Sequence, residues 1–157
     1  METTGVIDAL VKILSAIAIA AASSWITVQL SINKFRSERW WEKKVKAYEC
    51  VIEAFHNSKE FYSEHMIAEE ERRKVSDERD AELRKLSKEA KDQISRASDI
   101  GSFILSKEAL EILARYHSQL ASAPRGQTWY EYLDTDLSLT NSYMHEFIQE
   151  AHRDLKK

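Results

Sequence analysis

The stretch WEKKVKAYECVIEAFHNSKEFYSEHM, Trp41 to Met66, carries the clearest periodic pattern in the chain. Its large apolar side chains recur at spacings of four and three, with Lys59 at the one missing step, at Trp41, Val45, Tyr48, Ile52, Phe55, Tyr62 and Met66. This spacing gathers them on one face of an α-helix, which must pack against other elements. No glycine or proline lies between Val6 and Glu70, so one long helix is expected there.

The composition of the whole chain favours the same fold class. Of 157 residues, 43% are hydrophobic and 31% are charged, which argues against disorder. Three glycines and one proline are too few for a fold with many turns. The single cysteine, Cys50, excludes an intramolecular disulfide and fits a reducing compartment.

Three further helices are expected downstream, at residues 77–98, 106–121 and 128–155. Each begins at a residue that can cap a helix: Ser76, Ser106 and Thr128. Thr128 is followed three positions later by Glu131, the pattern of a capping box. The clearest loop lies between the last two helices, at Ser122–Gly126.

These helices carry apolar stripes that would be buried economically in an antiparallel bundle of about four helices, formed by residues 34–157. Phe103, Ile104 and Leu105 are expected to form a short apolar plug before the third of them. At least one of Trp40 and Trp41 is expected in the core. The other inward positions are expected to be Leu83, Leu86, Ala90, Ile94, Ala97, Leu110, Leu113, Tyr116 or His117, Leu120, Trp129, Leu133, Leu137, Thr140, Met144, Phe147, Ile148 and Ala151.

Upstream of the bundle lies the run ILSAIAIAAASSWITVQLSIN, Ile13 to Asn33, which holds no charged residue over 21 positions. As an α-helix it would be about 31 Å long, close to the thickness of a bilayer core. The pattern predicts a single transmembrane helix after a short tail of residues 1–12. Two alternatives are a cleaved signal peptide and a buried helix of a globular core.

The flanking charges predict an orientation for this helix. Basic residues that follow the run would lie at the inner surface, beside anionic lipid, which places the N-terminus outside and the bundle in the cytoplasm. The first 12 residues offer only Lys12. The juxtamembrane basic residues are Lys34, Arg36, Arg39, Lys43, Lys44 and Lys46.

Two features of the run suggest more than anchoring. Ala16, Ala20 and Ser24 recur every four residues, a spacing that lets helices approach closely and predicts a homo-oligomer or a protein partner. Chance spacing in an alanine-rich segment is the alternative. Polar side chains also dilute the run: Ser15, Ser23, Thr27 and Gln29.

No catalytic or cofactor-binding constellation is found. Glu53-x-x-His56 matches half of a di-iron site but has no second copy, and His145 and His152 are too far apart for one shared metal. The expectation is a protein that is not an enzyme and has no cofactor. The formal net charge of −3 disfavours nucleic-acid binding.

The segment Arg39-Trp40-Trp41-Glu42-Lys43-Lys44, the stretch Gly101–Ser106 and the closing Ala151–Leu155 together resemble a set of uncharacterised bacterial proteins. In that set, a short membrane span precedes a WWExK-like segment. The resemblance implies a single-pass protein of the bacterial inner membrane. It supplies no activity and no functional residue.

Two functions follow as hypotheses. The first is a membrane-anchored interaction or scaffold protein that self-associates or docks a partner. The alternative is a small membrane effector, a pore-forming or membrane-perturbing component of a bacterial defence or toxin system, motivated by the polar side chains of the span.

Overall fold

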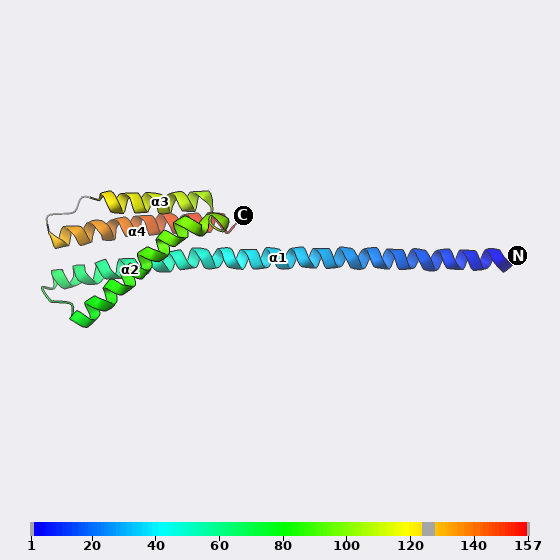
Figure 1. Cartoon of the computed structure of the whole chain (residues 1–157), viewed down its shortest axis with the longest axis horizontal. Coiled ribbons are helices and arrows are strands. Elements are labelled where there is room, and N and C mark those ends of the chain that lie inside the picture. Colours follow the sequence, from blue (N-terminus) through cyan, green and yellow to red (C-terminus); the bar gives the residue numbers. More distant parts are fainter. Residues whose placement is uncertain (1, 124–127, 157) are drawn as a thin grey trace. The chain divides into compact units, whose positions relative to one another are not determined.

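The computed structural model describes residues 2–123 and 128–156, with side chains from residue 17 onward. Over these residues the chain is helical and contains no strand (Figure 1). The elements are α1 (Glu2–Glu70), α2 (Asp77–Ile100), the 3-10 helix η1 (Gly101–Phe103), α3 (Lys107–Ser122) and α4 (Trp129–Asp154). The all-helical class and the three helices predicted downstream of α1 are confirmed.

The predicted helix starts are confirmed at the level of individual hydrogen bonds. Ser76 Oγ accepts from the backbone N–H of Arg79 at 3.3 Å, and Ser106 Oγ accepts from that of Ala109 at 3.0 Å. Thr128 and Glu131 form a complete capping box, with both hydrogen bonds at 3.2 Å. Each cap satisfies backbone donors that the first helical turn leaves without a partner.

The end of α1 is formed by a reversal at Arg72, whose φ of 52° lies in the left-handed region. The N–H of Arg73 donates back to the carbonyl of Ala68 at 2.9 Å. This six-to-one hydrogen bond is the Schellman arrangement, in which the left-handed position is usually glycine. Arginine there carries a side chain at a cost that glycine would avoid.

The chain divides into two units, Met1–Glu42 and Lys43–Lys157. In the second unit α3 packs against α4 and α2 packs against α3. Figure 1 shows α3 and α4 running in opposite directions. The core joins all four α-helices of the unit through completely or almost completely buried side chains, among them Tyr48, Phe55, Ile94, Leu113 and Phe147.

Most predicted core positions are buried or partly buried, but several aromatic ones are wrong. Phe103 is 80% exposed, since the tight turn of η1 buries Leu105 in its place. Trp129 stays 43% exposed in the first turn of α4, where its ring stacks on Tyr132 at 5.2 Å. Trp40 and Trp41 are both exposed, and in the second unit the buried face of α1 begins only at Tyr48.

The predicted transmembrane helix Ile13–Asn33 is not supported. Among the residues that the structure describes, no helix combines the length and the apolar character needed to cross a membrane. From Ile17 onward, serines and Gln29 interrupt the apolar residues, and the charged run starts at Lys34. This finding overturns the single-pass architecture, its orientation and the inner-membrane localisation that rested on it.

Candidate functional site

The first unit presents a run of exposed apolar side chains on α1, here called the apolar segment, Ile17–Trp41. Trp25 is 66% exposed and Phe35 is 57% exposed. Contiguous apolar surface of this kind usually marks an interaction site. The large apolar side chains that it exposes are Ile17, Ile19, Trp25, Ile26, Val28, Leu30, Ile32, Phe35, Trp40 and Trp41.

The residues predicted to pack helices together lie in the same helix. Ala20 and Ser24 are exposed one turn apart, which leaves them accessible to another helix. Ala16 lies in α1, but its side chain is outside the described residues, as is that of Ser15. No contact in the described part of the chain tests the predicted small-residue face.

The polar residues of the segment are also exposed, and one is satisfied locally. Thr27 Oγ1 donates to the carbonyl of Ser23 at 2.9 Å, a hydrogen bond within the helix. Ser23 and Gln29 lie on the exposed surface of α1. These polar side chains are therefore scattered over an exposed apolar surface and do not form a buried polar site.

Part of the predicted basic stretch is paired within the helix. Lys34 lies 3.8 Å from Glu38, and Arg39 lies 3.6 Å from Glu42. The Arg39 guanidinium also lies over the Phe35 ring, 5.3 Å from its centroid. Such exposed pairs contribute little to stability, but they reduce the net positive charge. Arg36, Lys43 and Lys46 are exposed.

Lys44 has a different place from its predicted neighbours. Its ammonium lies 2.8 Å from Asp154 Oδ1, and Asp154 is almost fully buried. Asp154 Oδ2 accepts a hydrogen bond from the Tyr48 hydroxyl at 2.7 Å. Lys44 therefore belongs to a polar network inside the second unit, and the prediction of a purely juxtamembrane role missed this contact.

The same network continues to the start of α3. The N–H of Ser106 donates to the Tyr48 hydroxyl at 3.2 Å, and Ser106 Oγ donates to Glu150 at 2.7 Å. Glu150 is buried and also accepts from Arg153. Burial raises the pKa of Tyr48 to about 12, against the lowering effect of its contacts with Ser106. Each polar side chain named in this network has a hydrogen-bond or ion-pair partner. The network therefore links the helices of the bundle and stabilises their packing.

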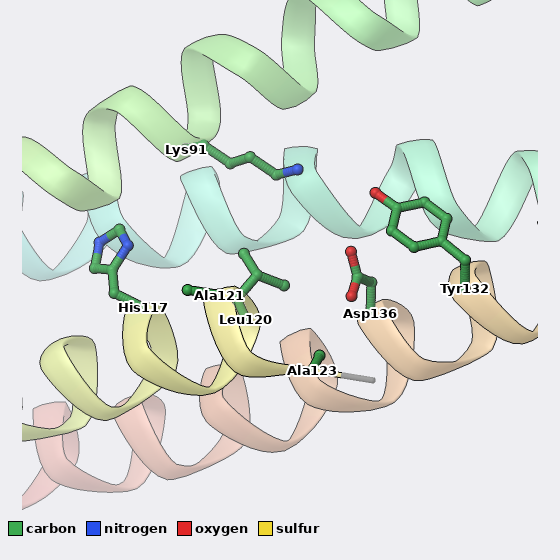
Figure 2. Close-up of a pocket in the computed structure, with 7 residues that line it drawn as sticks. All are labelled: Lys91, His117, Leu120, Ala121, Ala123, Tyr132 and Asp136. Atoms are coloured by element: carbon green, nitrogen blue, oxygen red, sulfur yellow. The ribbon is translucent and has the colours of Figure 1, made fainter. Parts of the chain in front are cut away.

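A second polar cluster lines a pocket of about 310 Å³ between α2, α3 and α4. Figure 2 shows the Lys91 amine and the Asp136 carboxylate directed into the same space. Burial lowers the pKa of Lys91, while the charge of Asp136 opposes that change. The other lining residues are His117, Leu120, Ala121, Ala123 and Tyr132.

The chemistry available in this pocket is limited. The described lining residues include no serine, threonine or cysteine nucleophile. The Lys91 ammonium lies 5.4 Å from the centroid of the Tyr62 ring, a contact that stabilises the charged form. The pocket can admit a small polar molecule. The opposite charges of Lys91 and Asp136 partly compensate for burial, whereas His117 Nε2 is buried without a hydrogen-bond partner among the described residues.

The other candidate residues are not brought together. Glu53, His56, His145 and His152 are exposed, and His145 contacts Gln149 at 2.8 Å. No group of three or more metal-binding side chains occurs among the residues that the structure describes. Cys50 is exposed.

Asp136 and Lys91 were not predicted as a pair, since 45 positions separate them and neither lies in a motif. Trp25, Ile26 and Val28 were predicted only as members of an apolar run.

Comparisons with protein-family models, with curated proteins and with solved structures find no match to this chain.

Proposed function

We propose that this chain is a non-enzymatic interaction protein whose apolar segment is the surface covered by another protein chain. The exposure of large apolar side chains along Ile17–Trp41 carries the proposal. An isolated helix in water gains little stability from its own backbone, so a long helix usually depends on packing of its apolar face. Covering this segment removes apolar surface from water and stabilises the helix together with the complex.

The second unit supports this role as a compact bundle with its own core. Its helices α2, α3 and α4 begin at capping residues, and the network of Tyr48, Ser106, Glu150 and Asp154 links α1, α3 and α4. The proposal therefore assigns this bundle the role of a folded domain that carries the apolar segment. The pore-forming alternative depended on a transmembrane helix and is not taken further.

Native mass spectrometry and chemical crosslinking of the full chain test the proposal. The expected result is a complex of defined mass that is lost in Phe35→Ser. Phe103→Ser is the matched control, since Phe103 is also an exposed phenylalanine but lies outside the apolar segment. A chain that stays monomeric at all concentrations and retains no protein partner, or a complex lost equally in both variants, would contradict the proposal.

A further inference from the structure

The apolar segment contains a regular seven-residue repeat. Within α1, its residues at alternating spacings of three and four are Ala18, Ala21, Trp25, Val28, Ile32 and Phe35. The same spacing continues backwards through the sequence at Leu14, Val11 and Ile7. A repeat of 3.5 residues keeps one stripe directed at a neighbouring helix along a left-handed supercoil. The stripe therefore specifies a helical partner.

The described stripe exposes enough surface for such a partner. Val28 is 54% exposed and Ile32 is 39% exposed, between the larger exposed fractions of Trp25 and Phe35. At about 150–250 Å² for a buried aromatic side chain, these four side chains offer roughly 400 Å² per helix. Two helices with their flanking residues would bury roughly 1,000 Å², the lower range of specific protein interfaces.

The positions that flank the stripe indicate the character of the partner. They hold Ala22, Ser24, Gln29 and Ser31, and no charged residue lies between Ile17 and Asn33. Flanking charges normally select one partner helix over another. These flanks demand no complementary charges from a partner, so a helix with the same repeat and uncharged flanks fits them, and a second copy of this chain has both properties.

Charge distinguishes the two possible directions of a second copy. The stretch Lys34–Lys46 has six basic and two acidic residues, and of the basic ones Lys44 is already paired with Asp154. A parallel pair would place two such stretches side by side, within the distance at which salt screens charges incompletely. An antiparallel pair separates them and turns each towards the end that carries Glu2, Asp8 and Lys12 in the sequence.

Side-chain volume favours the same direction. In a parallel pair each layer of the stripe contains two identical residues, so the Trp25 layer would be wide and the Ala21 layer narrow. In an antiparallel pair centred on Ser23, Ala21 faces Trp25 and Ala18 faces Val28 of the second copy. Small residues opposite large ones give the more even packing.

We propose that the apolar segment pairs with that of a second copy in an antiparallel coiled coil through this stripe. The inference rests on the proposed function and names its partner. Antiparallel pairing keeps the two basic stretches apart and matches alanines with large side chains across the interface.

Distance measurement between spin labels tests the direction of pairing. Lys34→Cys in a Cys50→Ser background carries one nitroxide per chain on an exposed position. At 1.5 Å of rise per residue, the antiparallel pair separates the two labels by about 20–35 Å along the helices. A parallel pair would place them about 10 Å apart and would overturn the proposal.

Two isoleucines of the same helix supply a matched comparison. Ile32→Ser changes the stripe and is expected to weaken self-association at least about tenfold, because two copies of the side chain are lost per pair. Ile26→Ser changes a side chain that is 54% exposed but lies off the stripe. This substitution is expected to weaken self-association less than about threefold. Equal effects of the two substitutions would overturn the proposed stripe.

The outcomes also separate this inference from the proposed function. If the chain forms a complex with a different protein and the spin labels show no defined distance between two copies, the second-copy inference is overturned and the proposed function stands. A strict monomer overturns both. Flotation of the chain with phosphatidylethanolamine–phosphatidylglycerol vesicles, accompanied by loss of the label distance, overturns the coiled coil as the state that covers the segment.

Discussion

The hydroxyl of Tyr48 donates a 2.7 Å hydrogen bond to Oδ2 of Asp154, which lies 106 positions further along the chain. Both side chains are buried, and the second carboxylate oxygen, Oδ1, is held by Lys44 at 2.8 Å. These contacts link the end of α4 to the part of α1 that belongs to the second unit. A buried donor that loses its acceptor costs more than the hydrogen bond contributes, so this contact is a sensitive point of the fold.

Asp154→Ala is expected to lower the free energy of unfolding by about 1–3 kcal/mol, because it removes the carboxylate that accepts from the Tyr48 hydroxyl and pairs with Lys44. Asp154→Asn keeps an acceptor oxygen and is expected to cost less. Urea unfolding followed by circular dichroism measures both. Equal stability of Asp154→Ala and the unchanged protein would show that water replaces the carboxylate at no cost.

Alkaline pH is expected to destabilise the bundle through Tyr48. Its folded pKa of about 12 lies above the usual value of 10.0, so the folded state binds the proton more tightly than the unfolded state. The resulting contribution to stability is complete below pH 10.0 and is lost as the pH rises towards about 12. Urea unfolding at a series of pH values across this window measures the loss.

Tyr48→Phe provides the control for this pH dependence. It removes the titrating hydroxyl, so the fall in stability across the same pH range should become shallower. Part of the fall should remain, because burial also raises the pKa values of Tyr62 and Tyr116. Identical slopes for the two proteins would assign the alkaline transition to groups other than Tyr48.

Arg72→Gly is expected to raise the free energy of unfolding by about 0.5–1 kcal/mol, because glycine adopts the left-handed region without a steric cost. Arg73→Gly is the matched control. Arg73 is not among the non-glycine residues with positive φ, so glycine there adds only unfolded-state freedom and should lower stability. Thermal and urea unfolding of the two variants would contradict this account if Arg72→Gly were the less stable.

The local part of this fold was predictable from the sequence. Ser76, Ser106 and Thr128 were expected to cap helices, and each does so through a hydrogen bond to a backbone N–H three residues on. Capping depends on neighbours within one helical turn, so the residues that decide it are adjacent in the sequence. The apolar spacing predicted the buried face of each helix for the same reason.

The long-range part was not predictable. Asp136 and Glu150 are buried although their residue type usually indicates solvent, because Lys91 and Ser106 approach from other helices. Hydropathy also failed at Trp129, which stays exposed because it lies in the first turn of its helix. Such outcomes depend on the packing of distant elements, which periodicity within one helix does not specify.

Two phenylalanines of α1 distinguish folding from association. Phe55 is completely buried, with its ring 5.0 Å from that of Tyr116 and 5.9 Å from that of Phe147. Phe55→Ala is expected to lower the free energy of unfolding by about 3–5 kcal/mol, because it removes this packing and leaves a cavity. Phe55→Leu should retain the fold at a smaller cost and keeps the measurement possible if the alanine variant does not fold.

Phe35→Ala is expected to have the opposite profile. Phe35 is exposed in the first unit, so its loss should change the unfolding of the dilute chain by less than about 0.5 kcal/mol while weakening association. Urea unfolding at low concentration and sedimentation at high concentration measure the two effects separately. If Phe35→Ala destabilised the dilute chain as strongly as Phe55→Ala, its ring would have to be buried within the folded monomer. The apolar segment would then be part of the fold instead of a surface for another chain.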